Sequence, residues 1–360
     1  GCVDWPRNCA DAATRETTAS SAHAPARVPA ATLLSPCPCC CPLAPPAGPA
    51  YLSGVSNHRP ILFMPTIRLD DRALLSVRGP DAESLLQNVV TPDLASLGEG
   101  AAKPGALLTP QGKILFDFLI ARDGEAGFVV ECRADTADDF LRRLMLYKLR
   151  AKVEITKQDQ GIVLVSWQND SGGSQLESPG SESDSGALAD TRFPKHLAAR
   201  RHYHAAPEAR ADTAHDAWTR LRIEHGVAES GTDYTLGDAF PHDVLFDQNG
   251  GVGLRKGCFV GQEVVSRMQH RGTARRRLLI VRAPSPLPAP GTPVTADGRP
   301  IGTLGSVAGG NGQAIVRIDR AKEAIDAGTT ISAGDVAVTL EIPPGMDFSF
   351  SEPKSDGAAQ

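Results

Sequence analysis

The sequence has few aromatic residues, little net charge and no long apolar run. Aromatic side chains make up 5% of the 360 residues, and the formal charge is −5 at pH 7. Such a chain has no general affinity for nucleic acids or other polyanions, so any contact of that kind would have to rest on a local basic patch. Because no stretch approaches the roughly 20 apolar residues that cross a bilayer, we expect no membrane partner.

Cysteine is also scarce once the first 63 residues are set aside. Six of the eight cysteines precede Met64, which leaves only Cys132 and Cys258 in the rest of the chain. Two cysteines so far apart argue against the disulfide framework that small secreted domains use. We therefore expect the protein to work in a reducing compartment.

Residues 1–63 differ in composition from the rest of the chain. They are rich in Ala, Pro and Ser and have no hydrophobic period, and cysteines and prolines crowd together at 35–42. That crowding lacks the Cys-x-x-Cys spacing of a zinc site, so we predict no metal there. The Ser-rich, acid-poor composition fits an organellar transit segment. We favour the other interpretation, a disordered leader translated ahead of Met64.

From Met64 onward, short strands alternate with helices. We predict strands within 67–78, 105–120, 128–132, 152–156, 162–166 and 201–204, and helices at 80–89, 136–150, 214–226 and from 262. This order favours an α+β fold built from ferredoxin-like modules over a doubly wound parallel sheet. In the helix at 136–150, we expect Phe140, Leu144, Met145 and Leu149 to share one broad apolar face.

The last third of the chain has a different sequence pattern from the part before it. Residues 278–342 read as short strands separated by turns rich in Gly and Pro, which predicts a small β-barrel. Residues 346–360 are predicted to be frayed. Arg275, Arg276 and Arg277 form the densest positive charge in the chain. They are either a solvated turn or a contact for an anion such as RNA.

The stretch from Lys256 to Gly272 concentrates the reactive side chains. It reads Lys-Gly-Cys-Phe-Val-Gly-Gln-Glu-Val-Val-Ser-Arg-Met-Gln-His-Arg-Gly. Gly257 and Gly261 bracket Cys258, so the backbone there can bend sharply or lie close to a ligand. A helix is predicted from Gln262, and its free N–H groups would favour a thiolate at Cys258. An inert buried cysteine before an ordinary helix is the plain alternative.

This stretch resembles the signature of the YgfZ-type folate-binding proteins of iron–sulfur cluster assembly, which are relatives of the glycine-cleavage T-protein. Other segments share the resemblance: Gln87-x-x-x-Thr91-x-Asp93, Gln111-Gly112-Lys113, Tyr147-Lys-Leu-Arg-Ala-Lys-Val153 and Asp190-x-Arg192. The resemblance runs from about residue 67 to residue 342. Pro92 and Phe259 stand where the family more often has Asn and Tyr.

The resemblance implies a three-domain, T-protein-like architecture around a central folate-binding opening. On that basis we assign residues 64–110 with 205–272 to a discontinuous first domain and 111–204 to the second, with a flexible loop at 169–186. Residues 273–345 form the C-terminal barrel. The disordered leader at 1–63 and the tail at 346–360 lie outside the domains.

The implied site combines a folate with a reactive thiol. Cys258 and Asp93 are the candidate catalytic residues, and the candidate folate contacts are Gln87, Thr91, Asp93, Phe259, Gln262, Glu263 and Arg267. The motif itself comprises Lys256, Gly257, Cys258, Gly261, Gln262, Glu263, Arg267, Arg271 and Gly272. A pteridine needs a carboxylate or carboxamide partner and an apolar wall, which these residue types supply. One thiol is too few for a resident cluster, so any cluster would be transient or shared.

The resemblance implies three possible functions. The first is a tetrahydrofolate-binding accessory protein that assembles or repairs iron–sulfur clusters in client enzymes through Cys258. The second is a folate-dependent aminomethyl or one-carbon transferase with Asp93 as catalytic carboxylate, and only in that case is the protein an enzyme. The third is an RNA-binding factor linked to tRNA modification. We expect folate and iron–sulfur proteins as partners and the bacterial cytosol as location, with the mitochondrial matrix as alternative.

Overall fold

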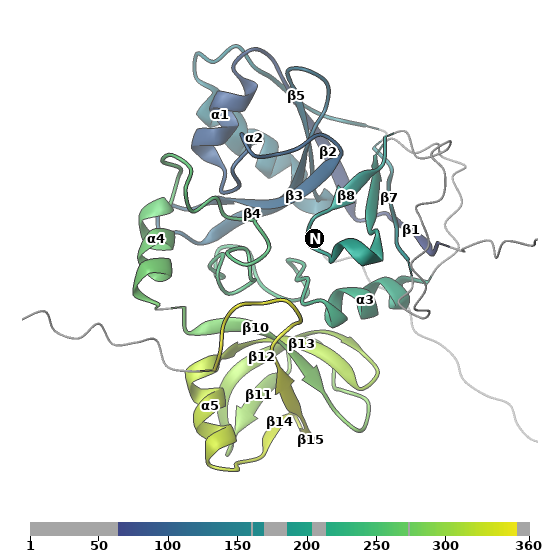
Figure 1. The fold of residues 1–360 in the computed structure, drawn as a ribbon, viewed down its shortest axis with the longest axis vertical. Helices are drawn as coiled ribbons and strands as arrows, with labels where there is room; N and C mark the ends of the chain where they lie inside the picture. Colours follow the sequence, from purple (N-terminus) through teal and green to yellow (C-terminus); the bar gives the residue numbers. More distant parts are fainter. Residues whose placement is uncertain (1–63, 160, 169–185, 204–213, 273, 351–360) are drawn as a thin grey trace, which may run out of the picture. The chain divides into compact units, whose positions relative to one another are not determined.

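The structure is a computed structural model that describes residues 64–159, 161–168, 186–203, 214–272 and 274–350. Its first sheet has nine strands in the spatial order β1-β7-β9-β8-β3-β4-β5-β2-β6 (Figure 1). The strands are β1 (Thr66–Leu69), β2 (Arg72–Arg78), β3 (Ala101–Leu108), β4 (Ile114–Arg122), β5 (Gly127–Arg133), β6 (Glu154–Lys157), β7 (Val163–Ser166), β8 (Leu188–Asp190) and β9 (Arg200–Tyr203). Among the pairings given for these strands, only β3 with β8 is parallel. The predicted α+β class is confirmed.

Both faces of this sheet are covered, because successive side chains of a strand point to opposite sides. In β2, Leu74 packs into one apolar cluster, whereas Leu75 and Val77 pack into another. Each of the three is fully buried. The near-continuous apolar run of β2 is thus explained by a strand with a core on each side.

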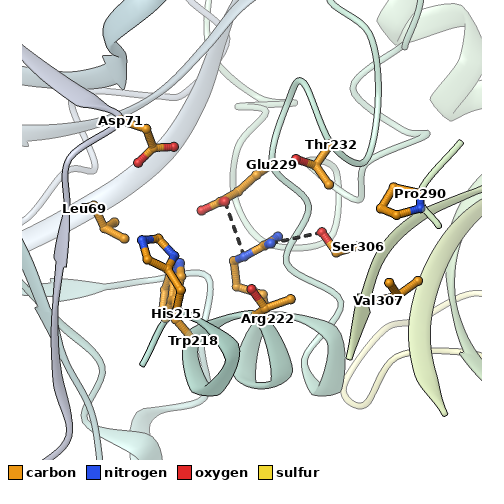
Figure 2. Close-up of a pocket in the computed structure, with 11 residues that line it drawn as sticks. Leu69, Asp71, His215, Trp218, Arg222, Glu229, Thr232, Pro290, Ser306 and Val307 are labelled. Atoms are coloured by element: carbon orange, nitrogen blue, oxygen red, sulfur yellow. Dashed lines mark hydrogen bonds and ion pairs between the residues drawn. The ribbon is translucent and has the colours of Figure 1, made fainter. Parts of the chain in front are cut away.

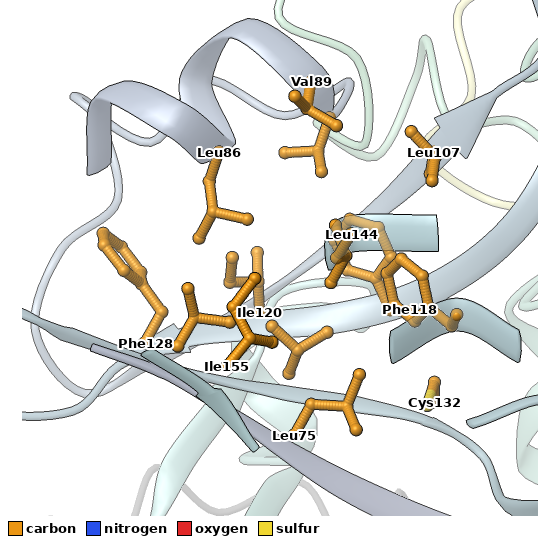
Figure 3. Close-up of a cluster of buried hydrophobic side chains, with 14 of the residues drawn as sticks. Leu75, Leu86, Val89, Leu107, Phe118, Ile120, Phe128, Cys132, Leu144 and Ile155 are labelled. Carbon is orange, nitrogen blue, oxygen red and sulfur yellow. The ribbon is translucent and has the colours of Figure 1, made fainter. Parts of the chain in front are cut away.

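The first core lies under α1 (Ala82–Val89) and α2 (Ala137–Lys148) (Figure 3). Its centre is aromatic: the ring of Phe140 from α2 stacks on Phe116 and Phe118 of β4, with centroids 5.0 and 5.4 Å apart. Cys132 is part of this core and is 1% exposed. It behaves as a small apolar residue, as its strand position predicted.

The second core lies on the other face of the sheet, against α3 (His215–Glu224). Trp218 of α3 is 2% exposed, and its ring meets those of Trp167 and Phe193 with centroids 5.9 and 5.4 Å away. Burying a side chain of this size contributes several kcal/mol, so Trp218 is a main anchor of α3.

The second sheet has seven antiparallel strands in the order β15-β14-β11-β12-β13-β10-β16. They are β10 (Arg276–Arg282), β11 (Pro293–Ala296), β12 (Arg299–Ala308), β13 (Asn311–Arg317), β14 (Ile331–Ala333), β15 (Val336–Ala337) and β16 (Thr339–Glu341). A helix that the sequence analysis did not predict, α5 (Ile318–Asp326), packs Ala321 and Ala324 against this sheet. The predicted barrel region therefore contains one helix as well as strands.

A fourth apolar cluster joins the two sheets through the segment after α3. Phe259 and Val265 pack there with Leu108 from the β3–β4 hairpin and with Leu278 and Ile315 from the second sheet. The strands predicted within 105–120 are present and form a hairpin with a Thr109–Gly112 turn. Two residues of the signature stretch, Phe259 and Val265, are thus part of the apolar core between the two sheets.

The core covers only part of the apolar surface of α2. Met145 and Leu149 were expected to share one apolar face with Phe140 and Leu144, but they are 46% and 88% exposed. That prediction was wrong, because the apolar run is wider than the face that the core covers.

The predicted domain boundary at 110/111 falls in the turn between the paired strands β3 and β4, and the domain assignment stays a prediction.

Several predicted features fall outside the described residues. These are the leader at 1–63, most of the loop at 169–186, and the end of the tail at 351–360. Within the described residues, the longest helix is α2 with 12 residues. None of these helices has the length and apolar character needed to cross a membrane.

Candidate functional site

The segment 253–261, which we term the motif loop, leads into helix α4 (Gln262–Arg271). Gly261 caps the helix with φ of 79°, and a Cβ there would lie 2.6 Å from the Thr109 carbonyl oxygen. Only glycine accommodates both conditions. Gly257, in contrast, has open space around it, so the bend predicted for the pair is required at Gly261 alone.

Lys256 ties the motif loop to the loop that comes after α1. Its Nζ donates hydrogen bonds to the carbonyl oxygens of Val90 (2.7 Å) and Pro92 (2.9 Å). The same ammonium group lies 5.1 Å from the ring centroid of Phe259. Burial lowers the pKa of Lys256 to about 8, an effect that the nearby Asp93 carboxylate partly offsets.

Backbone contacts reinforce this connection. The Gly253 N–H donates to the Thr91 carbonyl oxygen (2.9 Å), and the Thr91 hydroxyl donates to the Gly251 carbonyl oxygen (2.6 Å). A Cβ at Gly253 would lie 2.9 Å from the backbone nitrogen of Asp93. Residues 160 positions apart in the sequence, Thr91 and Gly251, are therefore in direct contact. Thr91, predicted as a folate contact, is fully buried in this joint.

Asp93 is held as a carboxylate at the edge of the joint. The Gln87 side-chain amide donates to it (2.8 Å), as does the Ala95 N–H (3.2 Å). The Gln87 hydrogen bond is the main reason that the pKa of Asp93 lies below its ordinary value. Gln87 also accepts from the Leu94 N–H (2.8 Å), so it organises this loop.

The two cysteines of the described chain lie in opposite environments. Cys258 is exposed on the motif loop, three residues before the cap of α4. Cys132 is buried, and burial raises the pKa of its thiol to about 12. The plain alternative for Cys258, an inert thiol inside the core, is therefore wrong.

A cavity of about 390 Å³ lies between the motif loop and α4. Its buried wall consists of Val252, Phe259 and Val265, while Gln262 and Arg255 supply polar groups. The full lining is Val252, Gly253, Leu254, Arg255, Phe259, Gln262, Val265, Ser266, Gln269 and His270. Ligand pockets with volumes of about 300–1,000 Å³ usually combine such an apolar wall with a few polar groups.

Other predicted site residues point elsewhere. Glu263 and Arg267 form an i,i+4 ion pair (2.6 Å) on the exposed side of α4, and neither lines the cavity. Arg271 is exposed at the end of α4, where Gly272 adopts φ of 58° as the C-terminal cap. Of the predicted folate contacts, Phe259 and Gln262 are the two that line the cavity.

The structure adds residues that the sequence analysis did not single out. Arg255, Ser266, Gln269 and His270 line the cavity, and their position inside or beside the signature stretch was the one sequence signal for them. Lys103 lies near Asp93, with its Nζ 3.4 Å from the Asp93 carbonyl oxygen. Lys103 is part of strand β3, and no local sequence pattern indicates that it lies near Asp93.

Four arginines and four carboxylates form what we term the buried ionic network: Arg72, Arg192, Arg201, Arg222, Glu131, Asp190, Glu229 and Asp233. Arg201 is fully buried and binds Glu131 (2.9 Å) and Asp190 (3.0 Å). Arg222 binds Asp233 (3.0 Å) and the Ser306 hydroxyl of β12 (3.0 Å). The network thus links the first sheet, α3 and the second sheet.

A second cavity, of about 250 Å³, lies beside this network (Figure 2). Arg222, Glu229 and Ser306 line it, and Figure 2 shows the contacts of Arg222 with the other two. Each of these charged groups is already paired within the protein. The charges of Arg222 and Glu229 are therefore accounted for by the network, and we take the cavity beside the motif loop as the candidate site.

The arginine cluster at 275–277 is largely neutralised. Arg276 pairs with Asp243 (2.9 Å) and Asp238 (3.2 Å), and Arg277 is buried against Asp247 (2.6 Å). Arg275 alone of the three is exposed without an ion pair among the described residues. The densest positive charge in the sequence is not a basic patch in the structure.

Comparison with solved structures identifies the fold. The chain is similar to the glycine cleavage system aminomethyltransferase T from Bartonella henselae, with a TM-score of 0.56 and 18% identity, over 81% of this chain and 87% of that one. Residues 275–348 match the family described as CAF17, C-terminal beta-barrel domain. The predicted T-protein-like fold with a C-terminal barrel is confirmed.

Comparison with curated proteins identifies relatives. The mouse protein named iron-sulfur cluster assembly factor IBA57, mitochondrial, is 30% identical over 307 residues, which are 77% of this chain and 84% of the mouse protein. The human protein of that name is 29% identical over 304 residues, covering 77% and 83%. The IBA57 homolog of Chaetomium globosum is 34% identical over 274 residues, which span 65% of this chain and 61% of the fungal protein.

These matches refine the predicted family. The sequence motifs resembled the YgfZ-type proteins, whereas the matches that span most of the chain are named IBA57. What the two interpretations share, iron–sulfur cluster assembly and the T-protein fold, is retained. The chain belongs to the IBA57 family of iron–sulfur cluster assembly factors.

Proposed function

We propose that this protein assists the assembly or repair of iron–sulfur clusters in client proteins, and that the Cys258 thiol is the group that meets iron. The observation that carries the proposal is the setting of Cys258: an exposed thiol on a loop that Lys256 pins to the body of the protein. An exposed but positioned thiol is what a transient iron ligand requires. The names of the mouse and human relatives support the same role.

The chemistry of the site favours a shared cluster. A cluster needs about four protein ligands, and no group of three or more His, Cys, Asp or Glu within the described residues could hold a metal ion. Cys258 therefore supplies one ligand, and an iron–sulfur carrier or client supplies the rest. The partner is defined here only by that chemistry.

Complementation tests this proposal. Cells that lack their own protein of this family would receive the wild type, Cys258→Ala or, as a matched control, Cys132→Ala. We expect Cys258→Ala to abolish rescue of iron–sulfur enzyme activity while its melting temperature stays unchanged. Cys132→Ala should rescue, although it removes a thiol from the core. Full rescue by Cys258→Ala would refute the role of this thiol.

Folate is the ligand that we propose for the cavity beside the motif loop. The lining fits the group: Phe259 and Val265 offer a wall for a flat pteridine, and the Gln262 carboxamide can pair with its amide edge. Arg255 supplies a cation for the glutamate carboxylates. A bound folate would bring a one-carbon carrier next to Cys258. The role of Asp93, Gln87 and Thr91 as folate contacts stays a prediction, since none of them lines this cavity.

Calorimetry with tetrahydrofolate tests the folate proposal. Gln262→Ala should weaken binding by about tenfold, the usual effect of removing a hydrogen bond to a ligand. Glu263→Ala is the matched control, since this neighbouring side chain lies outside the cavity, and the variant should bind like the wild type. Equal affinities for the wild type and Gln262→Ala would move folate to another site.

A folate-dependent aminomethyl or one-carbon transferase remains the alternative, favoured by the fold shared with the bacterial aminomethyltransferase. In that function Asp93 would act as the ionised carboxylate that Gln87 maintains. Turnover of a one-carbon-loaded folate that Asp93→Asn abolishes and Cys258→Ala preserves would establish it. The protein would then be an enzyme.

The RNA-binding alternative has little support. Arg276 and Arg277 are committed to ion pairs, and the names of the mouse and human relatives do not mention tRNA. Those names do say mitochondrial, so we propose the mitochondrial matrix in place of the bacterial cytosol. Because the chain spans 61% and 55% of the Chaetomium and Pyricularia relatives, activity and partners remain proposals for the whole protein.

A further inference from the structure

The C-terminal end of α2 exposes three large apolar side chains. Met145, Leu146 and Leu149 are 46%, 67% and 88% exposed. Met145 and Leu146 lie on the last turn of α2, and Leu149 is the residue that ends the helix, so the three lie close together at the helix end. The side of α2 that faces the core carries Phe140 and Leu144 instead. Contiguous exposed apolar residues mark an interaction surface more often than scattered ones do.

Leu149 also occupies a strained backbone position. Its φ is 44° and its ψ is −107°, and the Ala151 N–H donates to the Lys148 carbonyl oxygen (2.8 Å) to close a four-residue turn. These angles are close to those of the first central residue of a type II′ turn, which glycine normally occupies. Because the side chain is exposed, no packing in the described part of the chain compensates for the strain. Uncompensated strain is a reason to look for a function.

Positive charge predominates around the three apolar residues, where the Asp81 carboxylate accepts a hydrogen bond from the Lys152 N–H (2.7 Å). Arg143, Lys148, Arg150 and Lys152 have no ion pair among the described residues, and only Arg142 is paired, with Asp139. No acidic residue occurs between residues 140 and 153. This local excess of cations contrasts with the net charge of −5 for the whole chain.

We propose that this surface, Met145, Leu146 and Leu149 with the cations at 143, 148, 150 and 152, docks on an anionic lipid bilayer. Shallow insertion of a few apolar side chains and attraction of basic residues to acidic headgroups are each weak, but together they give reversible binding. The charge complementarity and the protruding leucines point to this occupant. This proposal departs from the expectation of no membrane partner, which was based on the lack of a long apolar run.

An acidic protein is the competing occupant, and the residue types disfavour it. Lysine is depleted at the cores of protein interfaces, and leucine is under-represented among their energetic hot spots. Neither cavity described above is lined by residues of this surface. The aromatic residue of this helix end, Tyr147, packs against the first core, whereas Leu146 and Leu149 protrude. Protruding leucines suit insertion between lipid headgroups.

Vesicle flotation with the full chain tests the proposal. We expect binding to vesicles that contain phosphatidylglycerol, weaker binding as salt rises, and no binding to vesicles of phosphatidylcholine alone. The double variant Leu146→Glu/Leu149→Glu should lose about tenfold or more in affinity, since it removes the insertion and adds negative charge. Ile325→Glu is the matched control, because Ile325 is 48% exposed on α5, and it should bind like the wild type.

Leu149→Gly separates docking from folding. Glycine relieves the strained turn, so the variant should melt at the same or a higher temperature and still bind anionic vesicles more weakly. Several results would overturn the proposal: binding that the Leu146/Leu149 variants do not change, equal binding to neutral vesicles, or displacement by inorganic phosphate alone. Leu149-dependent retention on immobilised polyglutamate without vesicle binding would assign the surface to an acidic protein instead.

Discussion

The buried ionic network and the motif loop use polar residues in opposite ways. In the network every arginine faces a carboxylate, and Arg201 is fully buried between two of them. In the motif loop, the hydrogen bonds of Lys256 go to backbone carbonyl oxygens and not to a carboxylate, and Cys258 is exposed. The charged groups of the buried ionic network pair with one another, and these ion pairs link the two sheets and α3. The motif loop is held in place by Lys256, by backbone hydrogen bonds and by the packing of Phe259, none of which involves the Cys258 thiol.

The largest expected difference between the two regions is in thiol reactivity. Iodoacetamide should label Cys258 in the native protein, whereas Cys132 should react more than about a thousandfold more slowly, because it reacts only when the core opens. Burial and the raised pKa of Cys132, about 12, act in the same direction. Mass spectrometry of the labelled peptides measures both sites in one sample. Comparable native rates would contradict the contrast, and equal labelling in denaturant is the control.

Arg222→Met tests the network itself. The change leaves Glu229 and Asp233 without their shared cation, and breaking a buried pair costs about 3–5 kcal/mol of the free energy of unfolding. Urea denaturation measures the loss. The same change at the exposed Arg320 of α5 should cost less than about 0.5 kcal/mol. A loss below about 1 kcal/mol at Arg222 would mean that the network is not what joins the two sheets.

Acid should weaken the buried ionic network. Burial alone would raise the pKa of Asp190 and Glu229, but neighbouring arginines outweigh it and lower both to about 2. A lowered carboxylate pKa stabilises the fold above the unfolded value and loses that contribution as pH falls. We therefore expect the free energy of unfolding to drop by a few kcal/mol between about pH 4.5 and about pH 2. Asp190→Asn should make the free energy of unfolding less dependent on pH in this range. An unchanged pH dependence would contradict the contribution of Asp190.

The smallest expected effect concerns Lys256. Burial lowers its pKa from 10.5 to about 8, so between these values the unfolded chain binds more protons than the folded one. Stability should therefore rise slightly with pH through this window. Urea denaturation at several pH values measures the increase in the free energy of unfolding. The part of this increase that is lost in Lys256→Met is due to Lys256. The variant should also label faster at Cys258, since the loop loses its anchor; an unchanged labelling rate would show that Lys256 does not position the thiol.

Local features of the fold could be predicted from the sequence. Helix α4, its Glu263–Arg267 ion pair and its terminal glycines depend on spacings of a few residues, and all are present. The β3–β4 hairpin is predicted by alternation around a Gly turn. Such features depend on backbone preferences and neighbouring side chains, which a sequence displays directly.

Long-range features could not be predicted in the same way. Arg201 lies 70 residues from Glu131, and Lys256 lies 164 residues from Pro92. No periodicity relates such positions. The prediction for Leu149 failed for a related reason, because an apolar pattern does not say how far the core extends over a helix.

The sequence by itself determined the signature stretch, the isolation of Cys258 from other thiols, and the succession of helices and strands, because these are properties of composition and short spacing. Only the tertiary structure decided that Cys258 is exposed, that its neighbour Phe259 lines a cavity, that Lys256 ties the motif loop to the Asp93 loop, and that Arg276 and Arg277 are neutralised. The physical reason is that burial and pairing of charge depend on which distant segments meet, and folding brings those segments together.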